Sequence, residues 1–201
     1  MVQNKGRFED TFEFPFTKHK EFYRIALEGL QRAGELKRLH DRRRRQKPLM
    51  DDDTLYLAEM NGLIELAPIV AVVFAALTLE AFINDYARER LSKGYFENYL
   101  DKLDVIAKWI VLPRVILGKQ LDPGGSGMNS LRWLVRLRNE LGHYKSKVKT
   151  VSTLDWWKDW VHLEDAQRSC GTVPALLSEL KKLDRSINTD WLASDYNLWP
   201  G

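Results

Sequence analysis

Two residues suited to acid–base and phosphate chemistry, Arg138 and His143, stand five positions apart, with Asn139 between them. An imidazole exchanges protons near neutral pH, and a guanidinium holds a phosphate through two hydrogen bonds. Together these groups suit cleavage of a phosphodiester without a metal ion. The histidine would move the proton of a ribose 2′-hydroxyl or of the leaving oxygen, and the arginine would stabilise the charge that develops on phosphate. A histidine that only decorates a helix surface is the alternative.

A helix over residues 129–144 has to position these groups. At 100° per residue, Arg138 lies in the middle of an apolar face. The other members of that face are Leu131, Leu134, Val135, Leu141 and Gly142. A second, polar stripe contains Arg132, Arg136, Asn139 and His143.

A guanidinium on an apolar face needs a partner, because an unpaired buried charge is costly. The most apolar stretch of the chain, residues 70–91, offers one. Glu80 and Asn84 are four positions apart and therefore share a helix face. We expect both side chains to meet Arg138 when the two helices pack. An ion pair that only holds two helices in register would produce the same pattern.

Residues 138–143, Arg-Asn-Glu-Leu-Gly-His, match the Arg-x4–6-His signature, and at this point the sequence resembles the HEPN family. Residues 79–85, Leu-Glu-Ala-Phe-Ile-Asn-Asp, look like the central-helix pattern of HEPN proteins that carry an acid and an amide there. Residues 101–104 and the glycine-rich loop before the motif helix also look similar. The resemblance covers roughly residues 55–150.

The resemblance implies a helical bundle that dimerises so that two Arg/His motifs face one cleft. Many relatives are metal-independent endoribonucleases in toxin–antitoxin or defence systems, and others are non-catalytic modules that bind RNA, a nucleotide or a protein. It assigns phosphate binding to Arg138 and general acid/base work to His143. Asn139 would orient the phosphate or the histidine, and Glu80 and Asn84 would position Arg138. Tyr144 follows His143 directly, whereas toxins paired with a nucleotidyltransferase often carry His-x-Tyr, so regulation by that partner class is in doubt.

Apolar periodicity predicts one all-α bundle of about four to five main helices over residues 17–187, and the resemblance implies that this bundle is HEPN-like. An N-terminal arm, 1–16, and a C-terminal tail, 188–201, flank it. The first helix ends in the basic run at 42–45, and the central helix runs from about Thr54 to Ser92, bent at Pro68. Short pieces follow at 100–109 and 113–117, and the last helix spans 174–187 with Pro174 in its first turn. Residues 145–172 look irregular, and 147–153 alternate as a strand would.

Composition restricts the class of protein. The 201 residues carry a net charge of +3 and one cysteine, Cys170, which excludes an internal disulfide framework and fits a reducing cytosol. The start of the chain shows no signal peptide, and the longest apolar run, 66–77, is too short for a bilayer span. We therefore expect a cytoplasmic protein without a membrane partner. No ligand cluster predicts a metal or another cofactor.

Several basic and aromatic residues could contact RNA, the expected partner. Candidates for phosphate contacts are Arg42, Arg43, Arg44, Arg45, Arg132, Arg136, Lys145 and Lys147. A solvated helix end is the alternative for the first four, which the helix dipole also favours. Trp156, Trp157 and Trp160 could stack on bases, or serve core or subunit contacts. The further expected partners are a second copy of the chain and an antitoxin or another protein.

Overall fold

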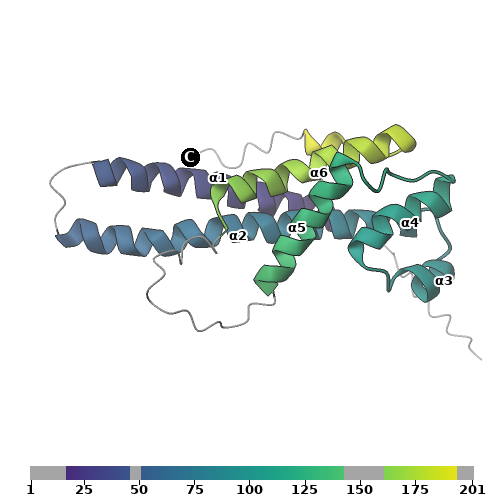
Figure 1. Cartoon of the computed structure of the whole chain (residues 1–201), viewed down its shortest axis with the longest axis horizontal. Coiled ribbons are helices and arrows are strands. Elements are labelled where there is room, and N and C mark those ends of the chain that lie inside the picture. The colour runs from purple at the N-terminus through teal and green to yellow at the C-terminus, as the bar shows by residue number, and fades with distance from the viewer. Residues whose placement is uncertain (1–16, 46–50, 143–160, 194–201) are drawn as a thin grey trace, which may run out of the picture.

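The chain folds into a bundle of α-helices (Figure 1). The computed structural model describes residues 17–45, 51–142 and 161–193, and for residues 51–55, 57–59 and 61 it describes the backbone alone. The prediction of an all-α bundle is confirmed, and the described ranges contain no strand. In chain order the elements are α1 (His19–Arg45), α2 (Asp51–Arg88), α3 (Lys93–Tyr95), η1 (Phe96–Leu100), α4 (Val105–Leu117), α5 (Ser126–Gly142), α6 (Leu163–Leu183) and η3 (Asp190–Leu192).

Helices α1 and α2 lie side by side and extend beyond the other helices at one end of the molecule (Figure 1). Small residues let them approach closely, because Ala26 and Ala33 of α1 and Ala67 and Ala71 of α2 are all buried. Gly29 marks the tightest point: a Cβ placed there would lie 2.9 Å from the backbone nitrogen of Ala71. The spacing of this pair therefore depends on glycine.

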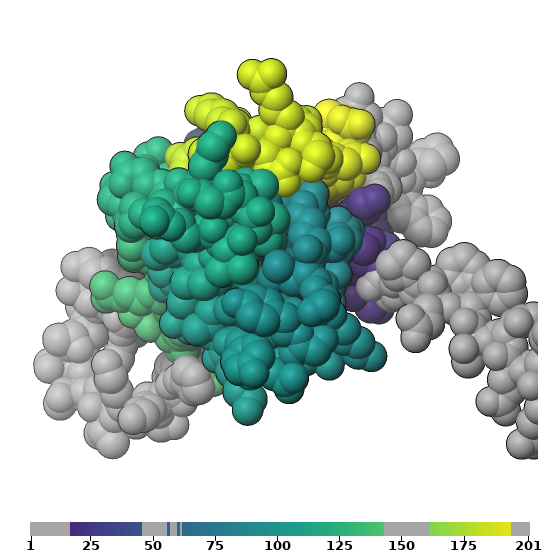
Figure 2. Space-filling view, turned by 90° about the vertical axis from the view of Figure 1, so that its right-hand side faces the viewer, coloured from purple at the N-terminus to yellow at the C-terminus, as the bar shows by residue number. Residues whose placement is uncertain are grey.

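Helix α2 is the centre of the bundle, and α1, α4, α5 and α6 all pack against it. The residues that fill the core are large and apolar, and they come from α4, α5 and α6 as well as α2. Trp109 of α4 is fully buried, stacks on Phe82 at 6.0 Å and donates a hydrogen bond from its indole nitrogen to the backbone oxygen of Leu79. The space-filling view shows the segment from α3 to α4 covering one end of the bundle (Figure 2). The end of α2 that carries Glu80 is thus fixed from several sides.

Two predicted helix boundaries were wrong, both beside a proline. Helix α4 runs without a break through Pro113, where we expected two short pieces. Helix α6 begins at Leu163 and contains Pro174, although 163–172 looked irregular and Pro174 looked like a helix start. An interior proline costs a backbone hydrogen bond. Here the fully buried neighbours Leu112 and Val173 anchor both helices, so tertiary packing outweighs the local preference.

The apolar run at 66–77 lies in α2, as expected, but it is not buried on every side. Gly62–Arg88 is the one stretch among the described residues that is long and apolar enough to cross a membrane, and 56% of its most apolar window is buried inside the bundle. A core helix passes the same test, and its packing against four other helices fits that role. The side chain of Cys170 on α6 is buried, and this burial raises the pKa of its thiol to about 12.

Candidate active site

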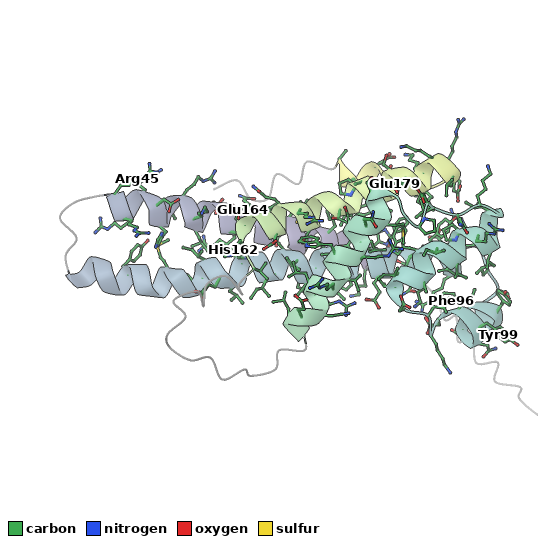
Figure 3. All side chains as sticks on the ribbon, in the orientation of Figure 1. Arg45, Phe96, Tyr99, His162, Glu164 and Glu179 are labelled. Carbon is green, nitrogen blue, oxygen red and sulfur yellow. The ribbon has the colours of Figure 1, made fainter. Side chains whose placement is uncertain are left out.

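Helix α5 carries residues 138–142 of the predicted motif, and its first turn is fixed by a carboxylate from α6. Glu179 accepts a hydrogen bond from the backbone nitrogen of Gly127 at 3.0 Å and one from the hydroxyl of Ser126 at 3.3 Å. Both contacts satisfy donors at a helix start, where the dipole also favours negative charge. Figure 3 labels Glu179 on α6 near the beginning of α5. With Leu131 and Leu134 fully buried, the helix has one defined rotation about its axis.

That rotation directs Arg138 toward α2. Its Nη2 donates a hydrogen bond to Oε2 of Glu80 at 3.0 Å. The predicted contact between these residues is therefore present. The side chains are 31% and 38% exposed, so the pair lies at the edge of the helix interface and water can reach it. A solvent-accessible ion pair contributes little to stability.

Asn84 was expected to join this contact, and the described part of the chain shows no hydrogen bond between it and Arg138. Instead, Oδ1 of Asn84 and Nε of Arg138 are both buried without a hydrogen-bond partner there. Buried polar atoms are nearly always paired, so each exception calls for an explanation. An unused acceptor on Asn84 and an unused donor on Arg138 give this side of the ion pair further capacity for polar contacts.

The polar stripe of α5 faces a different direction. Asn139 and Arg136 are exposed, and Nε of Arg136 contacts Oε1 of Glu140 on the same helix at 2.9 Å. Arg132 donates to the backbone oxygen of Pro123 at 2.6 Å and to Oδ1 of Asn129 at 3.1 Å. The stripe borders a shallow groove of about 460 Å³ together with Ile106, Val135 and Glu140. The structure therefore joins Arg132, Arg136 and Asn139 in one groove and directs Arg138 elsewhere.

The basic run Arg42–Arg45 lies far from this groove. It occupies the last turn of α1, at the tip of the helical pair, where Figure 3 labels Arg45. All four residues are exposed. Measured along α2, the distance from this tip to Glu80 is roughly 40 Å at 1.5 Å per residue. Within one copy of the chain, the run and Arg138 cannot contact the same phosphate.

His143, Tyr144, Lys145 and Lys147 lie outside the described residues, as do Trp156, Trp157 and Trp160. The roles assigned to them remain predictions. So does the suggested strand at 147–153.

A second polar cluster escaped the sequence analysis. Nδ1 of His19, at the start of α1, lies 2.9 Å from Oδ2 of Asp85 on α2, and the buried ring contacts Phe82 and Trp191. These side chains border a small cavity of about 190 Å³. The two partners are 66 positions apart and share no motif, so only the packed structure brings them together.

Asp184 and Tyr86 continue this cluster. The hydroxyl of Tyr86 donates to Oδ2 of Asp184 at 3.1 Å, and Nε of Arg90 lies 3.4 Å from the same oxygen. Burial opposes ionisation of Asp184, but hydrogen bonds from Ser186 and Tyr86 and the charge of Arg90 outweigh it, so the pKa of the carboxyl is lowered. Burial and the nearby carboxylate raise the pKa of Tyr86. The cluster ties the end of α6 to α2.

Among the residues that the structure describes, no group of three or more His, Cys, Asp or Glu side chains lies close enough to hold a metal ion.

Comparison with protein families, with curated proteins and with solved structures finds no match to this chain. The assignment to a function therefore depends on the residues and on their geometry.

Proposed function

We propose that this protein is a metal-independent endoribonuclease of the HEPN type, with a toxin or defence role. Arg138 binds and stabilises the phosphate, His143 is the general acid/base, and Asn139 orients the reacting groups. The observation that supports the proposal is the contact between Arg138 and Glu80. A guanidinium held by a carboxylate from another helix, with about a third of its side chain exposed, is oriented and still accessible to a ligand.

Orientation matters because phosphodiester cleavage of this kind depends on placing charge where it develops. Glu80 occupies Nη2 of Arg138 and fixes the plane of the guanidinium, so that Nη1 can take a phosphate oxygen. The ribose 2′-oxygen attacks phosphorus and the 5′-oxygen leaves. His143 accepts the proton of the 2′-hydroxyl and returns a proton to the leaving oxygen. The products are a 2′,3′-cyclic phosphate and a 5′-hydroxyl.

Asn139 faces another direction than Arg138 in the described structure and lies beside Arg132 and Arg136. Its proposed role is consistent with an RNA strand that follows this exposed groove while one phosphate reaches Arg138. The groove would bind backbone phosphates through its two arginines.

A non-catalytic module that binds RNA, a nucleotide or a protein is the second candidate. The contact between Arg138 and Glu80 favours this second candidate in one respect. The carboxylate of Glu80, 3.0 Å from Nη2 of Arg138, compensates much of the positive charge of the guanidinium. In this reading the ion pair holds α2 and α5 in register and takes no part in chemistry.

Cleavage of labelled RNA in excess EDTA distinguishes the two candidates. The wild-type protein is expected to cut the RNA, and His143→Ala and Arg138→Ala are each expected to lower the rate by about 10²–10⁴. His162→Asn is the matched control, since His162 precedes α6 and asparagine is favoured at a helix start. If the wild type leaves RNA intact, or if His143→Ala cuts equally well, the nuclease proposal fails.

A charge reversal tests whether the ion pair is only structural. The double variant Glu80→Arg/Arg138→Glu keeps opposite charges on the two helices. Its free energy of unfolding is expected to equal that of wild type within about 1 kcal/mol. The double variant is expected not to cleave RNA, because its arginine then projects from α2 and not from α5. Cleavage at the wild-type rate by this double variant would show that the position of the guanidinium does not matter.

The expected second copy of the chain, a protein antitoxin and a cytoplasmic location are part of the same proposal. Light scattering of the purified protein at several concentrations would test the first of these.

A further inference from the structure

The end of α6 carries a cluster of cations on its outward side. Ser178, Lys181, Lys182 and Arg185 are separated by three, one and three positions, so they lie on one side of the helix and of the turn that follows it. Together they border a shallow depression of about 370 Å³. We call this set the α6 basic face. The end of α6 lies at the surface of the bundle, at the top of Figures 1 and 2.

The α6 basic face points away from the core, because the fully buried leucines of this part of α6 occupy the other side of the helix. Lys182 and Arg185 are exposed, and Lys181 is partly buried. Nζ of Lys181 donates a hydrogen bond to Oγ1 of Thr189 at 2.7 Å. Thr189 is neutral, so this hydrogen bond orients the ammonium group and leaves its charge uncompensated.

The carboxylates nearest in sequence make their contacts elsewhere. Glu179 binds the first turn of α5, and Asp184 accepts a hydrogen bond from Tyr86 of α2. Among the described residues no carboxylate borders the depression, and neither Lys182 nor Arg185 forms an ion pair. The helix dipole favours cations in the last turn, but like charges three or four positions apart repel one another. An anion bound to the face would remove this repulsion.

The composition of the face is that of a surface for nucleic-acid phosphates. Arginine, lysine and serine are among the side chains through which proteins contact the phosphate backbone. A protein partner fits less well, because protein interfaces are poor in lysine and have an apolar centre. No apolar side chain of the described residues borders the depression. Backbone contacts of this kind position a strand and do not read its bases.

The face lies apart from the contact between Arg138 and Glu80. Glu179, the neighbour of Ser178, contacts Gly127 at the start of α5. Gly127 lies about 16 Å from Arg138 along α5, at 1.5 Å per residue. The face would therefore bind other phosphates of the strand than the one at Arg138.

We propose that the α6 basic face binds the phosphate backbone of an RNA strand, whatever its base sequence. Lys181, Lys182 and Arg185 pair with phosphates, and the hydroxyl of Ser178 donates to a phosphate oxygen. The inference rests on the proposed function in one respect, since both take RNA as the ligand, but it does not require cleavage. Three neutralised phosphates of a single strand contribute about 2 to the slope of log affinity against log salt concentration.

Fluorescence anisotropy with a labelled 2′-O-methyl RNA measures binding without cleavage, because this strand has no free 2′-hydroxyl. The affinity of the full chain is measured between about 50 and 200 mM NaCl. The triple variant Lys181→Gln/Lys182→Gln/Arg185→Gln is expected to lower the slope by about 2, so its affinity falls about 15-fold less over this range than that of wild type. At the lowest salt concentration it is expected to bind more weakly than wild type.

Two further variants serve as controls. Lys37→Gln/Lys93→Gln/Lys102→Gln removes the same charge from three exposed positions on other elements and is expected to keep the wild-type slope. Lys181→Arg/Lys182→Arg/Arg185→Lys keeps three cations on the face and is expected to bind as wild type does. It tests the face even if the glutamine variant does not fold, because exchange of one cation for another leaves phosphate binding in place.

Several results would overturn the proposal. They are an unchanged slope in the glutamine variant of the face, an equal loss in the control with three other lysines, and a loss of binding when the three cations are only exchanged. Displacement of the RNA by millimolar ATP at constant ionic strength would assign the face to a free nucleotide. Labelled poly-glutamate that binds the face more tightly than RNA would assign it to an acidic protein, and either assignment would also overturn the proposal.

Cleavage of unmodified RNA by the wild-type protein is measured separately, so the two proposals fail in different ways. A protein that binds RNA with the expected salt dependence and does not cut it refutes the nuclease alone. A protein that cuts RNA while the glutamine variant of the face binds as wild type refutes the role of the face alone.

Discussion

Gly29 allows a direct test of how α1 and α2 pack, because a single methyl group added there would meet backbone atoms. In Gly29→Ala the new Cβ would lie 2.9 Å from the nitrogen of Ala71, 3.2 Å from the oxygen of Ala67 and 3.2 Å from Cγ1 of Val70. The first two atoms belong to the backbone of α2, so they can move away only if the helices separate. Gly34→Ala is the matched control, since a Cβ at that position of α1 has no atom within 4 Å.

The two substitutions should change stability in opposite directions. Replacing a glycine inside a helix with alanine stabilises the helix by about 1 kcal/mol, and this gain applies to both variants. Overpacking a close contact costs about 1–3 kcal/mol, and this cost applies only to Gly29→Ala. The expected change in the free energy of unfolding is therefore an increase of up to about 1 kcal/mol for Gly34→Ala, and a decrease of up to about 2 kcal/mol for Gly29→Ala.

Urea denaturation followed by circular dichroism measures both variants against wild type. For a chain of this size, each 1 kcal/mol also moves the thermal midpoint by about 2–4 °C, so a melting curve provides a second reading. If Gly29→Ala is stabilised as much as Gly34→Ala, the helices are not in the close contact described, and the position of α2 within the bundle would have to be revised.

Three further predictions concern the ends of helices and the core. Glu179→Gln should lower the free energy of unfolding by about 0.5–1 kcal/mol, because the first turn of α5 loses its negative charge; an unchanged urea midpoint would contradict this. The pKa of Asp184 is lowered in the folded state. The ionised carboxylate therefore adds to the free energy of unfolding above the ordinary pKa of an aspartate, and this contribution is lost as the pH falls through the pKa of the folded state. The stability difference between wild type and Asp184→Asn should accordingly shrink between neutral pH and about pH 2, and a pH-independent difference would refute the assignment. The thiol of Cys170 is buried with its pKa raised to about 12, so it should react with iodoacetamide only as fast as the bundle opens, and rapid labelling under native conditions would contradict its burial.

The sequence contained enough information for the helices with strong periodicity and for one long-range contact. The apolar faces of α1, α2 and α5 repeat at helical spacing, so these helices were predicted to within a few residues. The contact between Arg138 and Glu80 was predictable for an electrostatic reason. A charge in the middle of an apolar face needs a counter-charge, and α2 offered one acid on its own apolar face.

Other features depended on information that a single sequence does not contain. The start of α6 was missed because Gly171 and Pro174 are typical helix breakers, and only the burial of their neighbours in the folded chain outweighs that preference. The pair His19–Asp85 joins two helices without any shared motif. By contrast, the different directions of Asn139 and Arg138 were already predicted from the helical spacing of residues 129–144.

The identity of the attacking group tests the central claim most directly. A cleavable RNA and the same sequence with 2′-O-methyl groups are incubated with the protein in EDTA, and the ends of the products are identified by mass spectrometry. The account predicts that only the unmodified RNA is cut and that its fragments end in a 2′,3′-cyclic phosphate, because the 2′-hydroxyl is the nucleophile. Equal cleavage of both strands, or fragments that carry a 5′-phosphate, would contradict it.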